Sequence, residues 1–174
     1  MYRIDLIVAH AAITGLIVAA VAVAHDVREV DIRDTCDPVT FNAALGEGIC
    51  VGDGNVTLEE FNEELPDGGH GDWKFNPDDT HIDEGDSLEL LNEGGETHTF
   101  TKVEQFGGGF IPALNEAVGG VPVVDECKDN APVDRRFIAA GASDTLHGLG
   151  VGTHRFMCCI HPWMRTVVEV REDD

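Results

Sequence analysis

The sequence predicts an all-β protein, an antiparallel sandwich or barrel, with a small helical annex on its N-terminal side. Beyond residue 72, short runs rich in Val, Ile, Thr and Phe alternate with turns of Gly, Asp and Asn, which is the pattern of short strands in an antiparallel sheet. Before residue 67, two segments instead carry the start and stop signals of helices. The chain of 174 residues has the length of one domain.

The first 24 residues are predicted to be a signal peptide. Arg3 precedes an apolar stretch, Leu6 to Val23, which ends in the small-residue pattern Ala22-Val23-Ala24 that is typical of an export signal. An uncleaved membrane anchor at residues 4–24 is the alternative, because about 20 apolar residues can cross a bilayer. Export would place the mature chain in the periplasm, or outside the cell as a secreted protein. Both environments are oxidising, so cysteines can form disulfide bonds there.

Residues 25–69 are expected to form the helical annex. Asp37-Pro38 combines an N-cap with a favoured first-turn proline and predicts a helix over residues 39–45. Thr57-Leu58-Glu59-Glu60 is a capping box and predicts a second helix that continues over residues 61–65. A piece this small needs support beyond its own core, and a disulfide between the two cysteines that bracket the first helix would supply it.

Eight strands are predicted after a Gly- and Asp-rich linker at residues 67–72. They are Trp73–Phe75, His81–Asp83, Ser87–Asn92, Thr97–Val103, Arg136–Ala139, Asp144–Leu146, Thr153–Cys159 and Thr166–Arg171. The segment 104–135 is rich in Gly and Pro and is expected to be a long insertion with a short helix near residues 112–118. Loops of this length are usually functional or held in place, and Cys127 offers an anchor.

The charge of the chain excludes some partners. There are 33 Asp and Glu against 11 Lys and Arg, giving a net charge of -22. Such a surface is repelled by the phosphates of nucleic acids and anionic lipids. We therefore expect no nucleic-acid binding, and contact with a membrane only if the N-terminal segment stays uncleaved.

The residues that carry chemistry lie near the C-terminus. Cys158, His161 and Met164 follow one another at C-x2-H-x2-M spacing in a tight loop. A thiolate, an imidazole and a weak thioether suit copper, and two His with one Cys and a long axial Met form the blue-copper arrangement. The second imidazole would come from His98, which follows a turn at Gly94-Gly95 and begins a strand at the end of the barrel.

Strand alternation separates the two adjacent cysteines. His154, Phe156 and Cys158 share one face of their strand, and Cys159 shares the other with Met157. Phe156 is expected to point inward, so Cys158 faces the site, while His154 lies about 13 Å away along the strand and is no ligand. The five cysteines then divide into one copper thiolate and two predicted disulfides, Cys36–Cys50 and Cys127–Cys159, with buried free thiols as the alternative for each pair.

At this point the chain resembles the cupredoxins, the blue-copper proteins, over roughly residues 73 to 171, and its ligand loop resembles that of amicyanin and plastocyanin. The matching features, in order, are Phe75-Asn76-Pro77, Gly85-Asp86-Ser87, His98, Gly152 to Cys158, His161 and Met164. The resemblance implies a Greek-key copper-binding domain at residues 70–174, with one type 1 copper bound by His98, Cys158, His161 and Met164. It departs from the family in the long insertion and at Thr99, whose backbone could still donate to the sulfur.

Copper held by four protein donors leaves no open position for a substrate. We therefore expect a one-electron carrier rather than an enzyme, with no small-molecule substrate and with a positively charged redox protein as partner. Exchange is expected at the ring edge of His161, beside Pro162 and Trp163. The alternative is a copper carrier or storage module without electron transfer. An oxidase or nitrite-reducing enzyme would need further clustered histidines, and the sequence has no H-x-H pairs.

Overall fold

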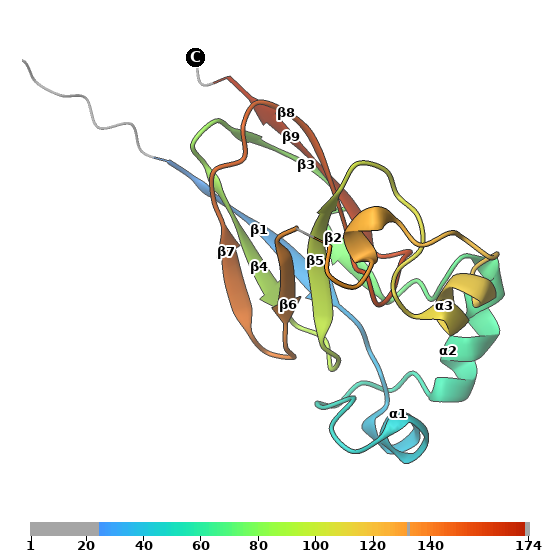
Figure 1. Cartoon of the computed structure of the whole chain (residues 1–174). Helices are drawn as coiled ribbons and strands as arrows, with labels where there is room; N and C mark the ends of the chain where they lie inside the picture. The colour runs from blue at the N-terminus through green and yellow to red at the C-terminus, as the bar shows by residue number, and fades with distance from the viewer. Residues whose placement is uncertain (1–24, 132, 173–174) are drawn as a thin grey trace, which may run out of the picture.

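The computed structural model describes residues 25–131 and 133–172, so the predicted signal peptide lies outside the described part of the chain. Two β-sheets face each other, and short helices gather at the end of the sheets that is remote from the first and last described residues (Figure 1). One sheet has four strands in the order β2-β1-β4-β7, and the other has five in the order β3-β9-β8-β5-β6. The predicted β-sandwich is confirmed.

All eight predicted strands are present, with ends that differ by at most two residues. In the four-stranded sheet, three of them are β2 (Lys74–Asn76), β4 (Ser87–Asn92) and β7 (Ser143–Leu146). The five-stranded sheet contains β3 (Asp79–Asp83), β5 (His98–Val103), β6 (Arg135–Ile138), β8 (Gly152–Met157) and β9 (Arg165–Arg171). The sheets are mixed rather than purely antiparallel, because β1 pairs with β4 and β3 with β9 in parallel. Parallel neighbours need crossover connections, and here the chain between β1 and β4 passes through the annex and through both sheets.

The strand β1 (Val27–Arg33) is not among the predicted strands, and it lies within the segment expected to be helical annex. It is an inner strand, antiparallel to β2 and parallel to β4, with Val30 opposite Leu90. Val30 and Ile32 are fully buried and alternate with Asp31, a short period-2 pattern that could have revealed the strand. The chain therefore enters the sandwich before it builds the annex.

Aromatic side chains fill the space between the two sheets. Phe100 stacks on Phe156 with ring centroids 4.4 Å apart, and it also packs at 5.2 Å against Phe75 of the opposite sheet. All three are buried. Burying a side chain of this size contributes about 1.5–3 kcal/mol to stability. The Phe75–Phe100 contact therefore holds the two sheets together close to the end where His98 and Cys158 lie.

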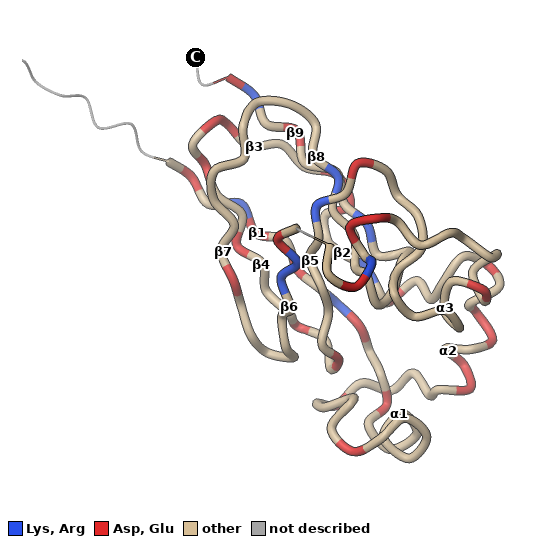
Figure 2. Tube along the Cα trace, viewed as in Figure 1, with Lys and Arg blue, Asp and Glu red and all other residues tan. Residues whose placement is uncertain are grey.

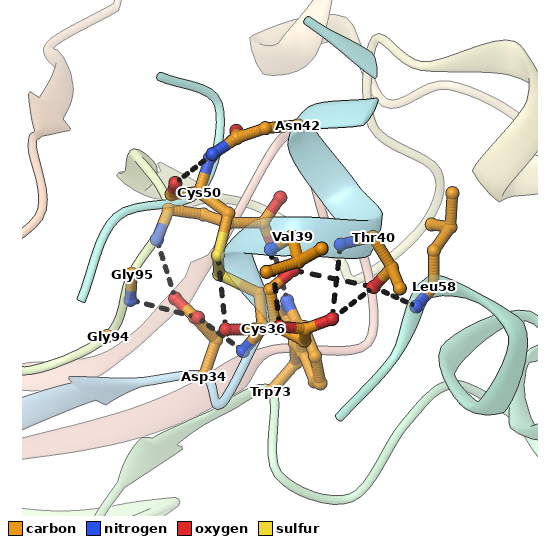
Figure 3. The surroundings of a disulfide bond; sticks show 12 residues. Asp34, Cys36, Val39, Thr40, Asn42, Cys50, Leu58, Trp73, Gly94 and Gly95 are labelled. Carbon is orange, nitrogen blue, oxygen red and sulfur yellow. Dashed lines mark hydrogen bonds between the residues drawn. A yellow bond between two sulfur atoms is a disulfide. The ribbon is translucent and has the colours of Figure 1, made fainter. Parts of the chain in front are cut away.

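The annex contains the helices α1 (Pro38–Leu45) and α2 (Leu58–Glu64), followed by the 3-10 turn η1 (Leu65–Asp67). Both predicted caps are confirmed: Asp37 accepts hydrogen bonds from the first turn of α1, and Thr57 and Glu60 form the capping box of α2. The disulfide Cys36–Cys50 is present, and Figure 3 shows it beside α1 with Trp73 nearby. The predicted staple of the annex is therefore confirmed.

Aromatic packing joins the annex to the sandwich. Phe61 of α2 lies 4.7 Å from Trp73 and 5.5 Å from Phe41 of α1 between ring centroids. All three rings are buried. The annex consequently has a small core of its own, and Trp73, which immediately precedes β2, makes that core continuous with the main one.

The insertion at residues 104–135 lies against the five-stranded sheet. It contains the predicted helix, α3 (Pro112–Ala117), and the 3-10 turn η2 (Asp125–Cys127). The predicted disulfide Cys127–Cys159 anchors it, and the Phe110 amide donates a hydrogen bond of 2.8 Å to the Cys159 carbonyl. The insertion is therefore fixed to the residue that follows Cys158.

Acidic residues are spread over strands, loops and helices (Figure 2). Residues 34–73, which include the annex, contain ten Asp and Glu but no Lys or Arg. Within residues 25–131 and 133–172, no helix is both long enough and apolar enough to cross a bilayer.

Candidate metal centre

Three predicted ligands come together at the annex end of the sandwich. His98 Nδ1 lies 3.8 Å from Cys158 Sγ and 3.3 Å from His161 Nδ1. The donor atoms all lie within 4.8 Å of one another, and the three side chains are buried. Metal bonds of about 2.0 Å to nitrogen and about 2.3 Å to sulfur, the values for zinc, allow donor separations of this size around one ion. The donor set therefore fits a single metal, and a thiolate with two imidazoles fits copper.

The loop between β8 and β9 holds its donors through backbone hydrogen bonds. The Cys158 amide donates to the Met164 carbonyl and the Met164 amide donates to the His161 carbonyl, each at 3.0 Å. Met164 is fully buried in the same core cluster as Cys158. Its backbone position is thus fixed beside the other donors, and the role of its thioether as fourth ligand stays a prediction.

The sulfur of Cys158 accepts several hydrogen bonds. The Thr99 amide donates to it at 3.3 Å, as the sequence analysis expected, and the His161 amide does so at 3.5 Å. Burial alone would raise the pKa of the Cys158 thiol, but the hydrogen bonds and charges of His161 and His98 hold its pKa well below the ordinary value. The surroundings of Cys158 therefore favour its thiolate, the form that binds a metal.

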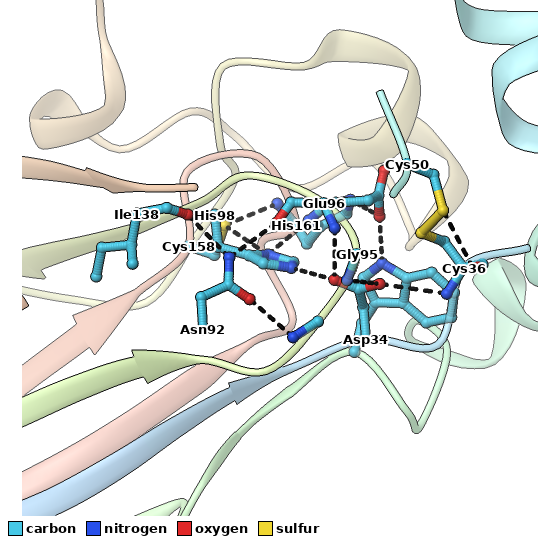
Figure 4. Close-up of polar contacts among 12 residues, drawn as sticks. Asp34, Cys36, Cys50, Asn92, Gly95, Glu96, His98, Ile138, Cys158 and His161 are labelled. Carbon is cyan, nitrogen blue, oxygen red and sulfur yellow. Dashed lines mark hydrogen bonds and ion pairs between the residues drawn. A yellow bond between two sulfur atoms is a disulfide. The ribbon is translucent and has the colours of Figure 1, made fainter. Parts of the chain in front are cut away.

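A buried carboxylate lies behind each histidine (Figure 4). Asp34 Oδ2 lies 2.8 Å from His98 Nε2, and Glu96 Oε2 lies 3.5 Å from His161 Nε2. Burial opposes charge on both Asp34 and His98, but their mutual hydrogen bond lowers the pKa of Asp34 to about 2 and raises the pKa of His98 to about 9. Burial raises the pKa of Glu96, although His161 and Trp73 act in the other direction.

The ring of His161 is covered, which corrects the expectation that its edge is exposed at the surface. His161 is only 4% exposed. Phe61 of α2 meets it edge-on with centroids 6.3 Å apart, and Trp163 lies at 5.4 Å. The Trp163 indole donates to the His70 carbonyl at 3.2 Å and stays half-buried. The outermost aromatic ring beside the site is therefore Trp163, because the annex packs over the histidine.

The structure separates the two adjacent cysteines as predicted. Cys158 is free and faces the histidines, whereas Cys159 is bonded to Cys127. His154 lies on the surface, with its Nε2 2.6 Å from the Gly150 carbonyl, away from the site. Sequence reasoning missed Asp34 and Glu96. Glu96 stands two residues before His98 and could have been noticed, whereas nothing near Asp34 in the sequence points to the site.

Comparisons with known proteins return cupredoxins among solved structures. No protein-family model and no curated protein matches the sequence. A purple cupredoxin from Nitrosopumilus maritimus is 12% identical, with a TM-score of 0.44, over 83% of this chain and 99% of that one. An oxidized amicyanin mutant is 14% identical, with a TM-score of 0.43, over 86% of each chain. A Cu(I) amicyanin mutant is 17% identical, with a TM-score of 0.39, over 56% of this chain and 73% of that one.

Identities and TM-scores this low leave the assignment of the site to the donor geometry described above. The group of His98, Cys158 and His161 fits a cupredoxin ligand loop. Within the described ranges it is the one cluster of three or more His, Cys, Asp or Glu side chains placed to share an ion.

Proposed function

We propose that the chain is an exported type 1 copper protein that carries single electrons between redox partners. The observation that carries this proposal is the buried group of one thiolate and two imidazoles, already gathered within 4.8 Å. Bound copper would supply the one-electron Cu(II)/Cu(I) couple. His98, Cys158 and His161 would hold it, with Met164 as the weak fourth donor.

The residues around the group favour electron transfer over catalysis. All four proposed donors are buried, and the rings of Phe61 and Trp163 pack against His161. This packing excludes water and leaves a substrate no approach to the ion. Backbone hydrogen bonds to the sulfur and across the loop hold the donors in place. Donors that move little between the two oxidation states keep the reorganisation that opposes electron movement small.

Trp163 is the proposed exit for the electron. It lies next to His161 and is half-buried, while His161 itself is covered. A partner that contacts this end of the molecule would also meet residues 34–73, a stretch that contains ten acidic residues and no Lys or Arg. A redox protein with a positive surface would be attracted there, through a small interface that dissociates quickly.

Export is part of the proposal. The apolar N-terminal segment has the pattern of a signal peptide. Two disulfides are the chemistry of an oxidising compartment, and cytosolic proteins seldom keep them. Together they support a periplasmic or extracellular carrier.

The visible spectrum of the copper-loaded protein tests the proposal. We expect an intense thiolate-to-copper band that Cys158→Ser abolishes, and fast electron exchange when the reduced protein is mixed with an oxidised cationic redox protein in a stopped-flow instrument. A colourless protein that releases copper to an acceptor without exchanging electrons would contradict the proposal and favour copper transport or storage.

A further inference from the structure

We propose that Asp34 and Glu96 act as positioning residues, each holding one ligand histidine, and that together they lower the reduction potential of the site. This inference rests on the proposed function, because it concerns the same copper. Neither carboxylate belongs to the donor set, and the two come from different parts of the chain: Asp34 directly follows β1, whereas Glu96 lies in the turn before β5. Figure 4 shows both beside the histidines.

Asp34 is held on several sides. Its Oδ1 accepts from the amides of Gly95 at 2.9 Å and Cys36 at 3.2 Å, and its Oδ2 accepts from the Glu96 amide at 3.0 Å. Its side chain is fully buried. Oδ2 remains free to accept from His98 Nε2 at 2.8 Å. A carboxylate fixed by three amides gives the imidazole a single orientation, with its proton on Nε2 and its Nδ1 toward the sulfur.

The sequence is adapted to this carboxylate. A side chain at Gly94 would occupy the place of the Asp34 carboxylate, and a Cβ at Gly95 would meet the sulfur of Cys36 at 2.7 Å. The disulfide Cys36–Cys50 begins two residues after Asp34 and ties this backbone to the annex. Consequently the two glycines leave the space that the Asp34 carboxylate and the disulfide occupy.

Glu96 serves His161 in the same way but less tightly. Its Oε2 accepts a 2.6 Å hydrogen bond from the Trp73 indole and lies 3.5 Å from His161 Nε2. Glu96 is buried. Because His161 Nδ1 faces His98, its Nε2 is the nitrogen directed at the carboxylate. Each proposed ligand histidine thus has its metal-side nitrogen on one face and an acidic oxygen on the other.

Among residues 25–131 and 133–172, the two carboxylates have no other cation to balance them. Of the ion pairs found in the described part of the chain, those of Asp34 and Glu96 involve only His98 and His161. Buried negative charge is unfavourable unless positive charge lies nearby. An ion of charge +2 compensates it better than one of charge +1. The pair therefore favours the oxidised ion, which lowers the potential.

The test compares three variants with the copper-loaded wild type in a spectroscopic redox titration. Asp34→Asn and Glu96→Gln each remove one charge beside a histidine, and Asp31→Asn removes a buried charge from β1 that contacts Arg33 and Asn76 instead. We expect Asp34→Asn to weaken Cu(II) binding ~10–100-fold, as loss of such a partner does. Each tenfold loss of Cu(II) affinity that is not accompanied by an equal loss of Cu(I) affinity raises the reduction potential by about 59 mV.

Glu96→Gln should raise the potential in the same direction by less, and Asp31→Asn should leave it unchanged. Asp34→Asn presents an NH₂ group to amides that need an acceptor, so it can fail to fold. Glu96→Gln avoids this problem, because its amide oxygen still accepts from Trp73.

A wild-type measurement provides a separate readout. In ¹⁵N NMR spectra of the Cu(I) protein, we expect a slowly exchanging Nε2 proton on His98, which the Asp34 contact protects. Rapid exchange of this proton would overturn the proposed role of Asp34. A coloured, redox-active wild type whose potential does not move in Glu96→Gln would overturn the inference alone. A wild type without copper or electron exchange would overturn the proposed function as well.

Discussion

Truncation of Phe61 tests whether the annex is part of the metal centre or only an attachment. Phe61 is 4% exposed and lies between Phe41, Trp73, Trp163 and His161, with ring centroids 4.7 to 6.3 Å away. Replacing a buried Phe by Ala removes its transfer free energy and leaves a cavity, at a cost of about 3–5 kcal/mol. Loss of this magnitude is a large fraction of the total stability of a domain, about 5–15 kcal/mol.

The assay for Phe61→Ala is denaturant unfolding of the copper-loaded protein, followed by the absorbance of the copper band and by circular dichroism. We expect a free energy of unfolding lower by about 3–5 kcal/mol and faster oxidation of the Cu(I) form by small reagents, because His161 loses its cover. Val39→Ala on α1 is the matched control, since Val39 is 74% exposed and surface changes of this kind stay within about 0.5 kcal/mol. A cost below about 1 kcal/mol with an unchanged oxidation rate would refute the packing of α2 over the site.

Four further outcomes are expected. Cys158→Ser should abolish the copper band while Cys159→Ser retains it, and the reverse result in absorption spectra would invalidate the alternation argument. Met164→Leu should change the potential more than the copper affinity, which parallel redox and binding titrations would measure. Trp163→Glu should slow electron transfer without loss of copper. The rate of electron transfer from the wild type to a cationic partner should fall as added salt shortens the screening length to about 8 Å. Stopped-flow rates that do not depend on salt would contradict electrostatic attraction of the partner. In the metal-free protein, the lowered pKa of Asp34 contributes about 2 kcal/mol to the free energy of unfolding above pH 3.8, the ordinary pKa of the group. This contribution is lost as the pH falls through about 2. The free energy of unfolding of Asp34→Asn should therefore depend less on pH in this range, as acid unfolding curves would show.

Local patterns predicted the strands and helices because each depends on near neighbours. The capping box at Thr57 and the alternation around Cys158 involve residues within three positions of one another, and both predictions are confirmed. The strand β1 was not predicted because its two alternating buried residues, Val30 and Ile32, lie among charged residues in a segment assigned to the annex. A short inner strand becomes recognisable only through the partners it pairs with.

The surroundings of the donors could not be predicted, because contacts over long sequence separations create them. Asp34 reaches His98 across 64 positions, and the parallel pairing of β1 with β4 sets where it lies. Phe61 reaches His161 because the core of the annex docks on Trp73. No periodicity or spacing encodes either contact. The group of His98, Cys158 and His161 could be named from the sequence, but the burial of these side chains and their carboxylate partners depend on how the annex packs.

The annex has two effects on a carrier of this kind that follow from one packing arrangement. By covering His161 it would move the proposed point of electron exit outward by one ring, to Trp163, whose indole donates a hydrogen bond to the His70 carbonyl. By its composition it also adds acidic side chains and no basic ones to this end of the molecule, although Lys74 and Arg165 line the same hollow as Trp163. A partner that approaches Trp163 would therefore also come near the acidic annex, while the thiol of Cys158 stays buried beneath the aromatic cover. In the proposed function, residues 34–73 would both attract the partner and cover the site. We expect changes at their exposed acidic side chains, unlike changes at Asp34 or Phe61, to alter partner choice without altering copper binding.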